Sequence, residues 1–527
     1  MAHIKNKALL LVLAVLAGVA CSEQQLKVDL LIVNGTVYNG IDQEPSSSAI
    51  GIKDDKIVFV GEETDNIVSQ KTIDAAGLIV SPGFIDPHTH ADRDLNKPDT
   101  SHNLPFLMQG VTTVVAGNDG DSFFPSKTYV EKYEKHGIGT NAVLLIGHET
   151  MRKEIIGLSD RVATDEEIAR MKQLLDKEMN DAGNFGMSTG LFYAPGSYAE
   201  TKEVIELAKT CAENGGIYDS HLRDESTYTV GLVAAVEEAI EIGRQAKLPI
   251  HISHIKCLGV DVWKQSDSII TMVENAHKEG IDITANQYPY EASATGLRAA
   301  TTPKWAQSGG QDSLLLRYDD PALRKRILQE TKNNIRRRGG PESLLIVVTA
   351  NPDYRNKTLK QIAAELNLPP EEAVYKILRT KGIVRVASFN MSNYDIQNFM
   401  RQDWVTTGSD GNTGHPRKYG SFPRKYSKYV VEEGVLDLPS FINGSSAKTA
   451  EIFKIPYRGK LKEGYFADII LFNPETFRDK ADYRNAFDYA EGLEYSIING
   501  KLAVEKGAYT NGLFGKVLRK NDSKQSN

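Results

Sequence analysis

Cysteine is scarce in this chain, which has three cysteines in 527 residues. Cys21 lies near the N-terminus, so only Cys211 and Cys257 remain for the body of the protein. Two cysteines are too few for a disulfide framework. We interpret Cys211 as a small buried hydrophobic residue. Cys257 follows His254 by three residues and could contact a metal there, but a strand ending at His254 would leave it out of reach.

An excess of positive charge is also lacking. The 62 lysines and arginines are outnumbered by 69 acidic residues, which gives a net charge of −7. This balance excludes an extended basic face for nucleic acid and favours solubility. The contents of 41% hydrophobic and 25% charged residues are ordinary for a globular protein with a sizeable core. We therefore expect a small-molecule partner and no nucleic acid.

No confident membrane span is present, because the apolar run at residues 8–20 is too short. Lys5 and Lys7 precede this run and small residues follow it, which predicts a secretory signal over residues 1–21. The tetrapeptide Gly18-Val19-Ala20-Cys21 resembles a bacterial lipoprotein processing site, although Gly18 replaces the usual leucine; simple signal-peptidase cleavage is the alternative. The expected location is the bacterial cell envelope, with membrane contact only through a lipid on Cys21.

The tripeptide His88-Thr89-His90 is the most informative motif. It follows the apolar residues 77–81 and the segment Pro82-Gly83-Phe84-Ile85-Asp86-Pro87, a pattern typical of a buried strand that ends at the histidines. Residues i and i+2 of a strand lie on one face, so both imidazoles can bind one divalent metal. The motif therefore predicts part of a metal site.

Three further polar residues follow short apolar or small-residue runs, namely His221, His254 and Asp410. Each is expected at the carboxyl end of a strand. Sites assembled from several strand ends are typical of (β/α)8 barrel enzymes.

The order of the predicted elements supports this α/β fold class. Strand-like runs alternate with helical stretches between residues 81 and 455, which predicts a (β/α)8 TIM-like barrel. Residues 292–345 break the alternation and are interpreted as an insertion that covers the strand ends. Short strands and turns at residues 27–80 and 456–515 predict one small β-sandwich built from both chain ends.

Taken together, these motifs resemble the amidohydrolase superfamily and, within it, the N-acyl-D-amino-acid deacylases (D-aminoacylases). The superfamily motif is the segment from Pro82 to His90. The closer resemblance spans roughly residues 28–510 and rests on motifs in a fixed order. They are Gly110-Val111-Thr112-Thr113-Val114-Val115-Ala116-Gly117-Asn118-Asp119-Gly120, Gly147-His148-Glu149-Thr150-Met151-Arg152, Ser188-Thr189-Gly190-Leu191-Phe192-Tyr193, His221-Leu222-Arg223-Asp224-Glu225, Ile252-Ser253-His254-Ile255-Lys256, Gly408-Ser409-Asp410-Gly411 and His415-Pro416-Arg417.

The resemblance implies a zinc site of one or two ions. His221, His254 and Asp119 would hold the tighter metal, and His88 and His90 would complete a second or weaker site. The family commonly has a bridging cysteine where this chain has Asp119. A carboxylate is a harder ligand, so the metal preference and the number of metals are open.

The resemblance also assigns catalytic and substrate-binding residues. Asp410 would be the catalytic acid/base, and Arg417 would bind the α-carboxylate of the substrate. Lys256, Tyr193 and Tyr288 are suggested as further substrate-binding residues. Whether Tyr288, Tyr290 or Ser293 lines the pocket is left open.

Structural interpretations stand beside these assignments. Asp119 and Asp410 both precede a glycine in turn-like sequences, so either could simply stabilise a turn. His102, His148 and His251 are interpreted as structural or supporting residues, and the arginine run at 336–338 as a solvated helix face.

The favoured function is zinc-dependent hydrolysis of the acyl amide bond of N-acyl-D-amino acids. A dipeptidase or cyclic-amide hydrolase of the same superfamily is the first alternative. A non-catalytic surface-binding lipoprotein is the alternative of another class.

Overall fold

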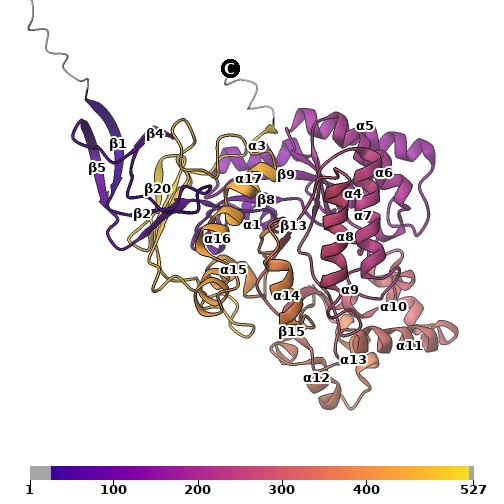
Figure 1. Cartoon of the computed structure of the whole chain (residues 1–527). Helices are drawn as coiled ribbons and strands as arrows, with labels where there is room; N and C mark the ends of the chain where they lie inside the picture. Colours follow the sequence, from indigo (N-terminus) through magenta and orange to yellow (C-terminus); the bar gives the residue numbers. More distant parts are fainter. Residues whose placement is uncertain (1–24, 521–527) are drawn as a thin grey trace, which may run out of the picture.

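The computed structural model describes residues 25–520, so the predicted signal segment and Cys21 lie outside the described residues. The described chain folds around an eight-stranded parallel sheet, flanked on one side by β-sheets and on the other by helices (Figure 1). None of the described helices is both long enough and apolar enough to cross a membrane.

The parallel sheet is the barrel that the sequence predicts. Its strand order is β17-β13-β12-β11-β10-β9-β8-β7, and the two end strands meet just beyond their last residues. There the Asp410 amide donates to the carbonyl of His88 at 2.9 Å, and Thr89 forms a parallel bridge with Gly411. The prediction of a (β/α)8 barrel is therefore confirmed. The strands are β7 (Phe84–Asp86), β8 (Val111–Ala116), β9 (Asn141–Gly147), β10 (Gly186–Gly190), β11 (Ile217–His221), β12 (Ile250–Ile252), β13 (Ile283–Gln287) and β17 (Val405–Thr407).

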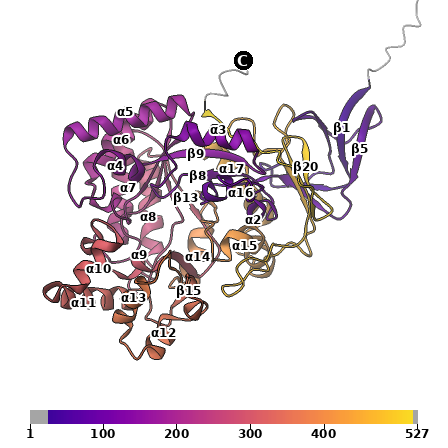
Figure 2. The same ribbon diagram turned by 180° about the vertical axis from the view of Figure 1, so that it is seen from behind.

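Helices cover the outside of the barrel, and α5 to α8 lie side by side in Figures 1 and 2. The longest of these, α5, begins with a capping box in which Thr164 accepts the amide hydrogen of Glu167 and Glu167 accepts that of Thr164. The covering helices and the nearby short ones are α1 (Asp92–Leu95), α2 (Leu104–Leu107), α3 (Ser126–His136), α4 (His148–Ile155), α5 (Asp165–Asp181), α6 (Thr201–Glu213), α7 (Leu232–Ala246), α8 (Ser266–Lys278), α14 (Asn393–Met400), α15 (Arg417–Arg424), the π-helix η4 (Lys425–Glu432), α16 (Leu438–Ser445) and α17 (Ala447–Ile452).

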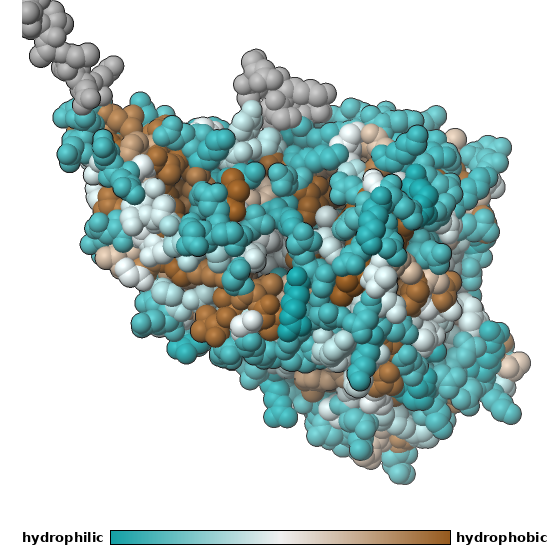
Figure 3. All heavy atoms as spheres, viewed as in Figure 1, coloured by the Kyte–Doolittle hydropathy of each residue, from teal (hydrophilic) through white to brown (hydrophobic). Residues whose placement is uncertain are grey.

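Two sheets from the chain ends form the β-sandwich. Strand residues alternate between faces, so Ile469 and Leu471 pack into the sandwich core, whereas Ile470 and Phe472 pack against Phe84 beside the barrel. The face drawn in Figure 3 is mostly hydrophilic, with apolar side chains gathered over these sheets. One sheet has the order β4-β3-β1-β5, with β1 (Leu26–Val33), β3 (Ala49–Lys53), β4 (Lys56–Gly61) and β5 (Ile67–Asp74); the other has the order β2-β6-β18-β19-β20-β21, with β2 (Thr36–Val37), β6 (Ile79–Pro82), β18 (Ile469–Phe472), β19 (Leu493–Ile498), β20 (Lys501–Glu505) and β21 (Ala508–Tyr509).

The inserted segment is longer than the sequence predicts. Its three-stranded antiparallel sheet has the order β14-β16-β15, so it continues to residue 389 and not to 345. Leu297, Leu344 and Val386 belong to a hydrophobic core of its own. The segment contains β14 (Ala292–Gly296), α9 (Leu297–Thr301), α10 (Gln311–Asp319), α11 (Pro321–Arg337), β15 (Leu344–Val348), α12 (Leu359–Glu365), α13 (Pro370–Leu378) and β16 (Arg385–Phe389).

The arginine run at the end of α11 is not a uniformly solvated face. Arg336 is exposed and pairs with Asp261 at 2.7 Å. Arg338, however, is buried and its Nε donates to the Tyr228 hydroxyl at 2.5 Å. The prediction is therefore wrong for Arg338, because the chain leaves the helix at this residue and turns its side chain inward.

Two residues of the Gly-His-Glu-Thr-Met-Arg motif, His148 and Arg152, contact one buried carboxylate. Glu203 on α6 accepts from His148 at 2.7 Å and also pairs with Arg152, and both partners lie on α4. All three side chains are buried. The structural interpretation of His148 agrees with this contact.

We expect Glu203→Gln to lower the free energy of unfolding by about 3–5 kcal/mol, since it leaves the buried Arg152 charge unpaired. Urea unfolding followed by circular dichroism measures this change. Asp181→Asn, in the exposed pair with Lys177, is the matched control and should leave the unfolding midpoint unchanged. Equal midpoints for both variants would contradict the assignment.

Candidate metal centre and active site

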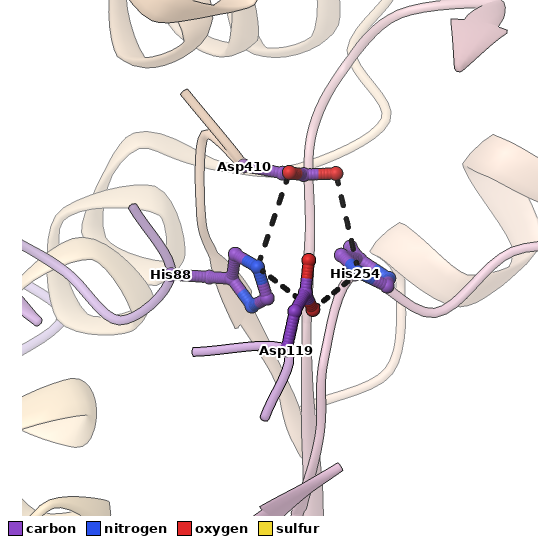
Figure 4. Close-up of side chains that lie close together, drawn as sticks. All are labelled: His88, Asp119, His254 and Asp410. Carbon is purple, nitrogen blue, oxygen red and sulfur yellow. Dashed lines mark hydrogen bonds and ion pairs between the residues drawn. The ribbon is translucent and has the colours of Figure 1, made fainter. Parts of the chain in front are cut away.

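Six predicted site residues meet at the carboxyl ends of the barrel strands. His88 and His90 follow β7, Asp119 follows β8, His221 ends β11, His254 follows β12 and Asp410 follows β17. Figure 4 shows four of them, His88, Asp119, His254 and Asp410, pointing toward one another. The structure thus brings together residues from five strands at one end of the barrel.

Asp119 is the centre of this cluster. Its Oδ1 lies 3.3 Å from Nε2 of His88, 3.3 Å from Nδ1 of His221 and 3.3 Å from Nε2 of His254. Its other oxygen, Oδ2, lies 3.6 Å from Nε2 of His90. Two donor atoms bound to a tetrahedral ion at about 2.1 Å lie about 3.4 Å apart. These spacings therefore fit a shared metal.

The hydrogen bonding of His88 also fits a metal. The side chain is fully buried, yet neither ring nitrogen has a hydrogen-bond partner among the described residues. An imidazole nitrogen left in this way is costly unless an ion binds it. The donor set of imidazole and carboxylate suits zinc and similar divalent metals.

Three of the cluster residues adopt left-handed backbone conformations. The φ angles are 57° at Asp119, 35° at His254 and 48° at Asp410. Non-glycine residues with such angles are uncommon and concentrate at functional sites. Asp119 is thus both a turn residue and a member of the cluster, so the turn and ligand interpretations of this residue are compatible.

Asp410 lies on the opposite side of the cluster from Asp119. Its Oδ1 is 3.4 Å from Nε2 of His90, and it accepts from Nη2 of Arg417 at 2.8 Å. Burial acts to raise the pKa of Asp410, but the positive charge of Arg417, followed by that of His254, holds it below its ordinary value. The carboxylate is therefore ionised at neutral pH and can accept a proton.

Arg417 is less accessible than a typical substrate-binding residue. The side chain is buried, its guanidinium lies 4.5 Å from the ring centre of Tyr288, and it lines neither cavity at the cluster. Its Nε and Nη1 have no hydrogen-bond partner within residues 25–520. Arg417 therefore contacts Asp410 with one nitrogen and retains donors for a further acceptor.

Glu225 adjoins the cluster, and the sequence assigned it no role. Its Oε1 lies 3.1 Å from Nδ1 of His254, and its Oε2 lies 3.7 Å from Nε2 of His221. Lys256 donates to the same carboxylate at 2.5 Å. A carboxylate that contacts two histidines restrains the orientation of their rings. The spacing of four residues between His221 and Glu225 is the feature of the sequence that could have indicated this contact.

An inner cavity adjoins the cluster, with a volume of about 20 Å³. Tyr288 and Ser293 line it, whereas Tyr290 does not and packs on His415 instead. Lys256, Tyr193 and Arg338 also line this space. The question left open by the sequence is thus answered in favour of Tyr288 and Ser293.

The remaining histidines and Cys257 lie outside the cluster. His102 Nδ1 accepts the Leu104 amide hydrogen, and His251 contacts Thr284 at 2.8 Å, so both are structural. Cys257 is buried and belongs to neither group of potential ligands found within residues 25–520.

A (β/α)8 barrel with histidines and carboxylates at its strand ends defines a class of barrel enzymes that use metals for hydrolysis. A model of the amidohydrolase family matches residues 71–504, and the chain belongs to this family.

Relatives with known names agree with this assignment. The chain is 30% identical to a D-aminoacylase of Alcaligenes xylosoxydans xylosoxydans, over 93% of this chain and 97% of that protein. A D-aminoacylase structure with a binuclear metal centre matches with a TM-score of 0.80 and 29% identity, over 93% of this chain and all of the other. An N-acyl-D-glutamate deacylase from Bordetella bronchiseptica, complexed with zinc and a phosphonate inhibitor, matches with a TM-score of 0.81 and 26% identity, over 94% of this chain and all of the other.

We expect Asp119→Ala to abolish metal binding, because it removes the carboxylate shared by four histidines. Metal bound per chain, measured by plasma mass spectrometry after dialysis, is the test. The matched control is Asp121→Ala in the same turn, since Asp121 pairs with Lys153. An Asp119→Ala protein that still bound as much metal as the unaltered protein would show that Asp119 is not a metal ligand.

Proposed function

We propose that this protein hydrolyses the acyl amide bond of N-acyl-D-amino acids to a carboxylate and a D-amino acid. The observation that carries the proposal is the position of Asp119 Oδ1, 3.3 Å from nitrogens of three histidines, with the ionised Asp410 facing the same space. The activities named for the relatives support the choice of substrate.

We propose one or two zinc ions as the cofactor. His221, His254 and Asp119 would hold the tighter ion, while His88 and His90 would complete a second site through the other oxygen of Asp119. The bound ion would acidify a water molecule and polarise the amide carbonyl. The zinc complex of one relative supports this identity, and the carboxylate of Asp119 is compatible with zinc.

Asp410 would move the proton. Its carboxylate would accept a proton from the attacking water and then deliver it to the leaving nitrogen. Without that delivery the amine is a poor leaving group. Burial and the contact with Arg417 fix the carboxylate in place.

The α-carboxylate of the substrate would bind near the inner cavity. Lys256 and Tyr288 line this cavity, and Tyr193 lines both the inner cavity and the opening beside it. Arg417 would supply its remaining donors, Nε and Nη1. A cyclic amide lacks a free α-carboxylate and would not need both Lys256 and Arg417, so this arrangement argues against the cyclic-amide alternative. The complete ligand cluster argues against a non-catalytic binding protein.

The test is hydrolysis of paired N-acetyl-D- and N-acetyl-L-amino acids by zinc-loaded protein lacking residues 1–21. We expect activity on the D series, and a loss of about 10²–10⁴-fold in kcat for Asp410→Asn with unchanged zinc content, because only proton transfer is removed. Folded, zinc-loaded protein that cleaves neither series would refute the proposed reaction.

We also propose that the protein is exported and anchored by a lipid on Cys21, on the basis of residues 1–21. Radioactive palmitate should label the protein in a bacterial host, and Cys21→Ser should abolish the label while Cys257→Ser retains it. Equal labelling of the Cys21→Ser protein would exclude this anchor.

A further inference from the structure

A second, larger cavity opens beside the metal cluster. It has a volume of about 300 Å³ and includes His90, Asp119 and Asp410 in its lining. Tyr193, Thr295 and Asp410 line both this outer cavity and the inner one. A substrate bound at the cluster therefore faces both spaces at once.

Three arginines line the outer cavity, namely Arg93, Arg298 and Arg385. Two of them come from the inserted segment: Arg385 begins β16 and pairs with Gly296, and Arg298 follows two residues later on α9. Arg93 comes from the barrel, on α1 just after His90. The insertion and the barrel thus direct positive charge into one space.

These arginines have no counter-ion. Within residues 25–520, none of the three side chains forms a hydrogen bond or an ion pair. The neighbouring Lys153, in contrast, pairs with Asp121 at 3.0 Å.

The carboxylates around the outer cavity do not neutralise this charge. Asp119 faces the histidines, and Asp410 pairs with Arg417. Burial raises the pKa of Glu149 well above its ordinary value, which favours its neutral form. Burial, followed by the charge of Arg93, lowers the pKa of Arg385 to about 10, so this guanidinium stays charged at neutral pH.

We propose that Arg93, Arg298 and Arg385 bind a second carboxylate of the substrate, so that the preferred substrate is a dianionic N-acyl-D-amino acid. This inference rests on the proposed function. The charge of Arg93 acts on Arg385, and Arg298 lines the same cavity. A carboxylate bound among these like charges would replace their repulsion with charge-assisted hydrogen bonds. Because the α-carboxylate occupies the inner side, the second carboxylate lies on the amino-acid side chain or on the acyl group.

Two matched pairs of substrates distinguish a carboxylate on the side chain from one on the acyl group. N-acetyl-D-glutamate is compared with N-acetyl-D-glutamine, and N-succinyl-D-leucine with its amide, N-succinamoyl-D-leucine. We expect kcat/KM for the dianionic member of one pair to exceed that of its monoanionic partner by at least about tenfold, the size of one charge-assisted contact. The pair whose two members differ in kcat/KM shows whether the second carboxylate lies on the amino-acid side chain or on the acyl group.

The variant Arg385→Met should lower that ratio by about tenfold, and Arg298→Met, measured in the same way, serves if the first does not fold. The ratio of the two kcat/KM values is the readout, because loss of fold or of metal lowers both values and leaves their ratio unchanged. Arg170→Met on the exposed face of α5 is the control and should leave the ratio unchanged.

Ratios near one in both pairs, or ratios that persist in both arginine variants, would overturn this inference while hydrolysis of N-acetyl-D-amino acids preserves the proposed function. Absence of hydrolysis for every D-substrate would overturn the two together.

Discussion

The contact between one carboxylate and four histidines is the constraint on which the site depends. Asp119 approaches imidazoles that follow or end three other strands, β7, β11 and β12, so the barrel must hold these strand ends in a fixed arrangement. Buried polar groups are tolerated only when they are satisfied, and both ring nitrogens of His88 and Nε2 of His221 have no hydrogen-bond partner within residues 25–520. Closure of the barrel between His88 and Asp410 then places the Asp410 carboxylate opposite the shared carboxylate of Asp119.

The sequence predicted the barrel and the residues that meet in the cluster because both leave local patterns. Alternation along a strand places His88 and His90 on one face, and a short apolar run before His254 or Asp410 indicates a strand end. The full extent of the insertion has no such local pattern, since β14 and β16 pair across almost a hundred residues. The burial of Arg338 against Tyr228 depends on how the insertion docks on the barrel, so residue type alone pointed to solvent.

Charge is distributed unevenly around the two cavities. On the inner side Lys256 is paired with Glu225, and beside it Arg417 is paired with Asp410, so the cations there are held by carboxylates that also contact the histidines or the cluster. On the outer side Arg93, Arg298 and Arg385 form no ion pair with any residue between 25 and 520. The inner side therefore restrains the geometry of the clustered histidines, while the outer side retains electrostatic attraction for an anion that enters the cavity.

The small volume of the inner cavity has a kinetic consequence. About 20 Å³ is room for roughly one water molecule, far less than an amino acid occupies. Ser293 and Arg338 of the inserted segment line this cavity, and the segment has a hydrophobic core of its own. An outward shift of these lining side chains would enlarge the cavity without disturbing the core of the barrel. If such a shift were slower than bond cleavage, it and not the chemistry would limit turnover.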